Sequence, residues 1–83
     1  MVASAMDGPA ETLDLRGLKC PLPALLTEKA LRSLAPGARL IVACTDPLAA
    51  IDIPHAAATC GATVEATETR DGALVFSLRR RAG

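Results

Sequence analysis

The sequence has almost no aromatic side chains: among 83 residues Phe76 is the only one, and Trp and Tyr are absent. A core must therefore be built from Leu, Ile, Val and Ala packed around a single ring. The apolar share of 51% is sufficient for this, and the length allows one domain with a modest core.

Neither sign of charge prevails, because nine basic residues balance nine acidic ones. Binding to nucleic acid or to an acidic membrane surface needs a positive field. We therefore expect no direct membrane partner, and nucleic acid at most as an indirect one. The one basic cluster, at 79–81, is expected to be a solvated tail, with a docking patch for an acidic partner or RNA as the alternative.

Long apolar runs are lacking as well. No stretch reaches the roughly 18 apolar residues of a membrane helix, and residues 1–11 lack the basic start and apolar centre of a signal peptide. We expect these residues to be a disordered leader, followed by a single domain at 12–80 and a flexible tail at 81–83. The three cysteines are widely spaced, which does not indicate a disulfide framework. A cytoplasmic protein with reduced thiols is therefore expected.

Apolar periodicity divides the chain into six elements. Strands are predicted at 12–16, 40–44, 63–69 and 74–78, and helices at 21–34 and 47–60. Two strand–helix units imply parallel strands joined by right-handed crossovers, and the Asp-Gly turn at 71–72 indicates a closing antiparallel hairpin. The predicted fold is a two-layer α+β sandwich, β-α-β-α-β-β, with both helices on one face of a mixed sheet.

The same patterns predict which side chains are buried. The buried face of the first helix is expected to comprise Leu22, Leu25, Leu26, Ala30 and Leu34. The inward residues of the last two strands are expected to be Val64, Ala66, Leu74, Phe76 and Leu78. In the second helix, Asp46 is expected as the N-cap and Pro54 should kink or split the helix, with Asp52 capping the second piece.

Cys20 stands where the first strand has ended, Gly17 has turned the chain and a helix begins. The first turn of a helix carries unpaired N–H groups and the positive end of the dipole, which favour a thiolate over a thiol. Lys19 adds a positive charge with the same effect. Pro21 and Pro23 fit the first helical turn and fix the backbone that carries the sulfur. We therefore predict a lowered pKa for Cys20, supported by these four neighbours.

Few kinds of thiol chemistry are open to Cys20. A cysteine protease needs a histidine base, and the only histidine, His55, falls in the second helix. Proline at position 23 excludes a Cys-x-x-Cys redox site, and the Cys and His spacings offer no close pair of metal ligands. Persulfide transfer remains, which needs no metal or organic cofactor. The alternative is that Cys20 is simply a small buried apolar residue.

The segment at 13–23, Leu-Asp-Leu-Arg-Gly-Leu-Lys-Cys-Pro-Leu-Pro, resembles the signature of the TusA/SirA-like sulfur-carrier family, whose hallmark is Cys-Pro-x-Pro. The resemblance continues through Thr-Asp-Pro at 45–47, Asp-Ile-Pro at 52–54 and Gly61, and covers about residues 12–80. It implies a four-stranded sheet in the order 1-2-4-3. It also implies that Cys20 carries persulfide sulfur between proteins.

The resemblance further implies a protein sulfur donor, either a cysteine desulfurase or a rhodanese, and a protein sulfur acceptor. The destinations in such a family are tRNA thiolation, molybdenum-cofactor maturation and sulfur oxidation. Leu22 stands where some tRNA-linked members carry an acidic residue, which weakens the first of these. Arg16 and Asp46 are the candidate docking residues, and a monomer is expected.

Two other functions stay open. A non-catalytic regulatory or interaction module of the same fold would not use the thiol. A redox switch would pair Cys20 with Cys44, which ends the central strand beside the Cys20 turn; otherwise Cys44 is a buried apolar residue. Cys60, at the end of the second helix, is expected to be structural.

Overall fold

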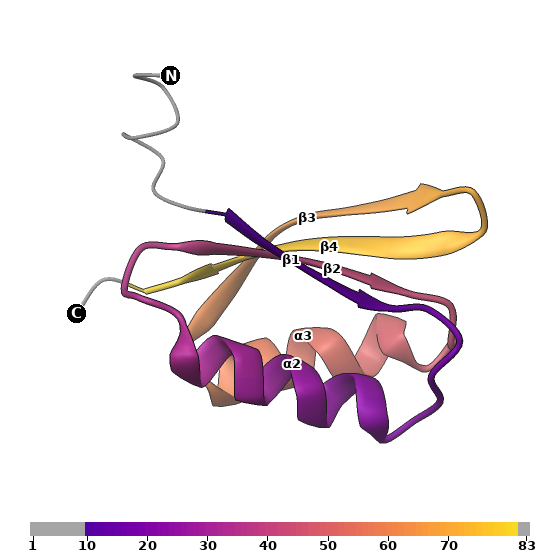
Figure 1. Ribbon diagram of the computed structural model, residues 1–83, viewed down its shortest axis with the longest axis horizontal. Coiled ribbons are helices and arrows are strands. Elements are labelled where there is room, and N and C mark those ends of the chain that lie inside the picture. The colour runs from indigo at the N-terminus through magenta and orange to yellow at the C-terminus, as the bar shows by residue number, and fades with distance from the viewer. Residues whose placement is uncertain (1–9, 82–83) are drawn as a thin grey trace.

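The computed structural model describes residues 10–81, in which two helices cover one face of a four-stranded sheet (Figure 1). The elements are β1 (Ala10–Leu15), α2 (Leu22–Ser33), β2 (Arg39–Cys44), α3 (Ala49–Thr59), β3 (Ala62–Arg70) and β4 (Ala73–Arg80). The strands lie in the order β1-β2-β4-β3, with β1 parallel to β2 and β4 antiparallel to both of its neighbours. The predicted two-layer α+β fold and its sheet order are confirmed.

The ends of the domain differ from the predicted boundaries. Strand β1 begins at Ala10, so Ala10 and Glu11 are strand residues rather than leader. The rest of the expected leader, at 1–9, and positions 82–83 of the expected tail lie outside the described residues. No helix within residues 10–81 is long and apolar enough to cross a membrane.

The core lies between the sheet and the helices and is aliphatic around one ring. Phe76 is only 1% exposed, and Leu31, Val42, Ile53 and Leu78 are completely buried. Burial of each such side chain contributes about 1.5–3 kcal/mol to folding. Helices α2 and α3 pack on each other as well as on the sheet. Both begin at the edge where β1 and β2 end, because each helix follows one of these parallel strands (Figure 1).

The alternation predicted for β3 fails at a β-bulge. Val64 pairs with Leu78, but Ala66 pairs with Ser77, so one extra residue is inserted between the two pairs. An inserted residue exchanges the faces of the side chains that follow it. Val64 is half-buried, whereas Ala66 is exposed. The prediction that Ala66 points inward was wrong, because a bulge leaves no trace in the apolar pattern.

Helix α3 runs unbroken from Ala49 to Thr59 although Pro54 lies inside it. The proline removes one backbone donor, but the buried neighbours Ile53 and Ala57 hold the helix against the core on either side. The predicted split was therefore wrong, and Asp52 caps no second helix.

The basic cluster is part of the fold rather than a solvated tail. The Nε atom of Arg79 lies 2.6 Å from Oε2 of Glu65. Nη1 of Arg80 donates to the carbonyl oxygens of Leu31 and Leu34, at 2.8 Å each. Arg80 thus donates to carbonyls at the C-terminal end of α2, of which that of Leu31 also accepts the N–H of Leu34. The expectation of a solvated tail was wrong for both arginines, because pairing in the sheet brings the end of β4 against the end of α2.

Candidate functional site

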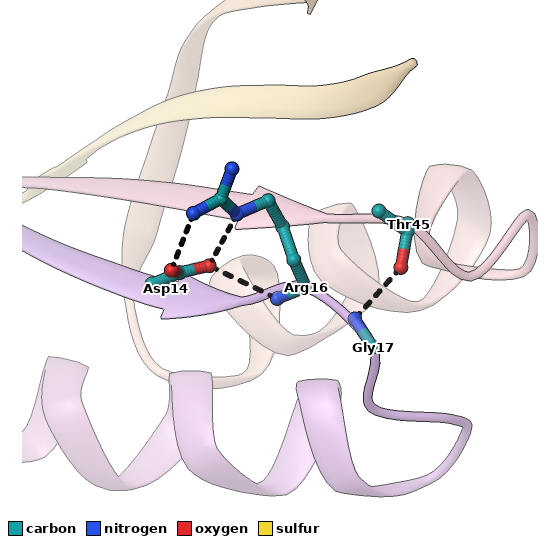
Figure 2. A network of polar contacts seen from close by, with 4 residues as sticks. All are labelled: Asp14, Arg16, Gly17 and Thr45. Atoms are coloured by element: carbon teal, nitrogen blue, oxygen red, sulfur yellow. Dashed lines mark hydrogen bonds and ion pairs between the residues drawn. The ribbon is translucent and has the colours of Figure 1, made fainter. Parts of the chain in front are cut away.

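The candidate site forms where β1 and β2 end side by side. Their parallel register pairs Leu15 with Cys44, so the loops that follow the two strands leave the sheet at the same edge. The first loop turns at Gly17, whose φ of +85° lies in the region that favours glycine. The Gly17 N–H donates to Oγ1 of Thr45 at 2.8 Å, which ties the first loop to the second (Figure 2).

Asp46 makes the second and closer link between the loops. Its Oδ2 accepts the backbone N–H of Cys20 at 2.5 Å, and its Oδ1 accepts the N–H of Leu48 at 3.0 Å. These two bonds, together with the charge of Lys19, lower the pKa of the Asp46 carboxyl. The sequence predicted an N-cap and a candidate docking residue here, but the N-cap residue of α3 is Leu48. Asp46 instead positions the cysteine and the start of α3 together.

Cys20 is exposed and lies just before α2. The N-cap residue of α2 is Pro21, and no side chain accepts a capping hydrogen bond there. Pro23 lies in the first turn of α2. Pro21 is exposed, whereas Pro23 is buried and anchors the start of the helix in the core. Pro23 therefore lies in the first turn as predicted, whereas Pro21 precedes the helix as its N-cap. Because Cys20 is exposed, the alternative of a buried apolar residue was wrong.

The pKa of the Cys20 thiol is raised, not lowered. The largest cause is the nearby carboxylate of Asp52, followed by partial loss of solvent around the sulfur and by the negative charge of Asp46. The prediction of an activated thiolate considered only the local dipole and Lys19. The prediction was wrong because the fold brings the carboxylates of Asp52 and Asp46, which are distant in sequence, near Cys20.

Arg16 and Lys19 supply the positive charges of this edge. Nε of Arg16 lies 2.8 Å from Oδ1 of Asp14, and Nη2 lies 2.8 Å from Oδ2, on the side of the sheet away from α2 (Figure 2). This pair lowers the pKa of Asp14 to about 2, chiefly through the side-chain hydrogen bond. Lys19 is exposed, and its positive charge helps to lower the pKa of Asp46. Of the two, only Lys19 acts on the groups that hold Cys20.

Four large apolar side chains are exposed at the helix starts beside Cys20. They are Leu22 (48% exposed), Leu25 (55%), Leu48 (51%) and Ile51 (70%), and we call them the apolar collar. The prediction that Leu22 and Leu25 are buried was wrong, because the buried face of α2 runs through Pro23, Thr27 and Leu31. The apolar pattern followed the leucines and so predicted a neighbouring face of the helix.

The other two thiols are less accessible. Cys44 is completely buried, which together with Asp46 raises its pKa to about 11. Cys60 is half-buried at the C-cap of α3, with its Sγ atom 3.9 Å from the carbonyl oxygen of Glu28. His55 is exposed on α3. Within residues 10–81 no three Cys, His, Asp or Glu side chains gather as metal ligands.

Sequence reasoning missed Thr45, Asp52 and the apolar collar as parts of this site. The signal for Asp52 was its spacing from Asp46, which places both carboxylates at the start of α3. That spacing was interpreted as a pair of helix caps. Thr45 belonged to the Thr-Asp-Pro segment that carries the resemblance, but its contact with Gly17 depends on the parallel pairing of β1 with β2.

The fold and the site together define a small α+β domain that presents one exposed thiol at the edge of its sheet. Compared with protein-family models, residues 11–80 match the model described as Sulfurtransferase TusA. The chain therefore belongs to the TusA sulfurtransferase family, and its general role is in sulfur transfer.

Proposed function

We propose that the protein is a sulfur carrier that accepts persulfide sulfur on Cys20 and relays it to an acceptor protein. The observation that carries this proposal is the exposure of Cys20 on a loop whose backbone is held by Asp46. A carrier must present its sulfur to two different proteins in turn, which needs an accessible atom on a fixed mount. Gly17, Lys19, Pro21 and Pro23 are the supporting residues of that mount.

The transfer is a thiol–persulfide exchange that balances without an oxidant. The sulfur of Cys20 attacks the outer sulfur of a donor persulfide, and the donor's S–S bond breaks as the new S–S bond forms. The electron pair of the broken bond stays on the donor's inner sulfur, which ends as a thiol with the proton that Cys20 lost. The acceptor then repeats the step on the loaded Cys20, and the free thiol returns.

Docking of both partners is assigned to the apolar collar, with Lys19, Arg16 and Asp46 at its margin. Exposed apolar side chains gathered next to a reactive atom are typical of a transient protein interface. The donor is a cysteine desulfurase or a rhodanese, and the acceptor belongs to tRNA thiolation, molybdenum-cofactor maturation or sulfur oxidation. This exchange is assigned to the cytoplasm, where a reducing environment keeps the three cysteines as free thiols.

The test is intact-mass measurement after the reduced protein has been incubated with a cysteine desulfurase and free cysteine, or with a rhodanese and thiosulfate. A gain of one sulfur atom is expected in the wild type and in Cys44→Ala and Cys60→Ala, and no gain in Cys20→Ser. No gain from either donor would favour the regulatory-module alternative. The burial of Cys44 weighs against the redox-switch alternative, because thiol–disulfide exchange needs access to both sulfur atoms.

A further inference from the structure

The loop at 17–20, which bears Cys20, is held at both of its ends by consecutive residues of the loop that follows β2. Gly17, at the start, donates its backbone N–H to Oγ1 of Thr45 at 2.8 Å (Figure 2). Cys20, at the end, donates its backbone N–H to Oδ2 of Asp46 at 2.5 Å. Two side chains that are neighbours in sequence therefore hold two backbone positions that lie 28 and 26 residues before them.

The bond to Gly17 lies where the chain leaves the sheet. The register of β1 with β2 ends at the pair of Leu15 and Cys44. Gly17 and Thr45 follow shortly after this pair, and the φ of Gly17, +85°, turns the chain away from β1. A change in the position of Gly17 is therefore passed along the loop to Cys20.

Apart from these bonds, open space separates much of the two loops. A cavity of about 390 Å³ lies between them, lined by residues 17–19 and 45–47. Gly17 and Thr45 are both exposed, so burial in the core does not hold them together. Leu18 is half-buried against the core and anchors the middle of the loop. The ends of the loop are consequently fixed by the two hydrogen bonds.

We propose that Thr45 is a positioning residue and that Thr45 and Asp46 form a two-point clamp on the loop at 17–20. The clamp keeps Cys20 in one place relative to the apolar collar, so that a docked partner meets the sulfur in the geometry of attack. A displacement of about 1 Å between reacting atoms can slow a reaction about a hundredfold. The role in transfer rests on the proposed carrier function, whereas the clamp itself is a property of the free protein.

The experiment measures the rate of sulfur loading by intact mass at increasing concentrations of a cysteine desulfurase. Thr45→Val keeps the shape of the side chain but removes the acceptor. We expect it to lower the maximal loading rate at least about threefold and to leave the half-saturating donor concentration unchanged, because the clamp acts after docking. Thr45→Ser keeps the hydroxyl and should load at nearly the wild-type rate.

Thr59→Val is the matched control for this substitution. Oγ1 of Thr59 donates a hydrogen bond to the carbonyl oxygen of His55 at 3.0 Å, and the residue lies at the far end of α3 from the site. Thr59→Val should therefore load like the wild type. A wild-type maximal rate in folded Thr45→Val, a change only in the half-saturating concentration, or equal slowing in Thr45→Ser would each overturn the proposal.

A measurement without any donor tests the clamp separately. The backbone amide of Gly17, followed by NMR, should exchange its hydrogen faster in Thr45→Val than in the wild type or in Thr59→Val, because it loses its acceptor. Equal exchange in all three proteins would refute the clamp whatever the loading rates are. Failure of the wild type to accept sulfur would refute the carrier function and leave the exchange result standing.

The two points of the clamp should also depend on each other. A loop released at Cys20 gains little further freedom from release at Gly17, so the effects of the two changes should not add. Thr45→Val combined with Asp46→Ala should therefore load only slightly more slowly than Asp46→Ala alone. Loading rates that fall by the product of the two single effects would show that the side chains act independently and not as one clamp.

Discussion

The carboxylate of Asp46 and the backbone N–H of Cys20 are joined by a 2.5 Å hydrogen bond across 26 positions of sequence. The same carboxylate accepts the N–H of Leu48, so the loop after β1 and the start of α3 share one side chain. The position of the cysteine therefore depends on the second strand–helix unit as well as on its own.

Replacing Asp46 with Ala should lower the temperature of unfolding and slow the sulfur loading of Cys20, because two backbone donors lose their acceptor. Asp46→Asn, which keeps one carbonyl oxygen, should fall between the wild type and Asp46→Ala. Thermal unfolding followed by circular dichroism and loading followed by intact mass would measure both effects. Wild-type loading in Asp46→Ala would show that the bond does not position the cysteine.

The stability that Asp46 contributes should depend on pH. Its pKa is lowered in the folded protein, so the contribution is present above the ordinary carboxyl pKa of 3.8 and is lost as the pH falls through the folded value. The difference in unfolding temperature between the wild type and Asp46→Ala should be full at pH 7 and shrink as the pH drops below 3.8. A difference that stays constant in acid would mean that the charge of the carboxylate plays no part.

Gly17→Ala should destabilise the fold by about 1–2 kcal/mol through backbone strain alone. The φ of Gly17 is +85°, and an added Cβ would meet no atom within 4 Å. Gly37→Ala is a matched control, because its φ is +84° and its Cβ would also meet nothing within 4 Å, but it lies between α2 and β2. Urea unfolding should show similar losses for both variants, and only Gly17→Ala should slow the loading of Cys20. Equal slowing by both variants would contradict a specific role for the Gly17 turn.

Leu25→Ser and Ile51→Ser should reduce donor-dependent loading severalfold while leaving stability within about 0.5 kcal/mol, because both side chains are largely exposed. The alkylation rate of Cys20 should not change, since iodoacetamide needs no docking surface. Ala66→Ser, on the exposed part of β3, serves as the control and should load normally. If both collar variants load at the wild-type rate, the partners do not dock on the collar.

Cys44→Ala should load one sulfur atom like the wild type but unfold with a free energy about 1–2 kcal/mol lower, because it leaves a small void in the core. Because Cys44 is completely buried, its sulfur is not accessible to a donor persulfide, and burial also raises its pKa to about 11. Urea unfolding and intact mass would check the two expectations. A disulfide between Cys20 and Cys44 after mild oxidation of the folded protein would instead support the redox switch.

Local patterns in the sequence were sufficient to predict the elements, their order and the loop that bears Cys20. Apolar periodicity indicates which face a strand or helix buries, and Gly17 and Asp71-Gly72 mark turns through local backbone preferences. The Cys-Pro-x-Pro segment is also a local feature. The resemblance seen in it agrees with the family match over residues 11–80.

Only the tertiary structure determined the environment of the cysteine. The bulge at Glu65 exposes Ala66, and the packing of α2 through Pro23, Thr27 and Leu31 exposes Leu22 and Leu25. The pairing of β1 with β2 brings Asp46 to the backbone of Cys20. Each of these results depends on contacts between residues that are distant in sequence. The raised pKa of Cys20 depends on such contacts too, because its causes are the carboxylate of Asp52, loss of solvent and the charge of Asp46. The sequence therefore determined which atom is placed at this edge of the fold, and the tertiary structure determined the charges and the surface around it.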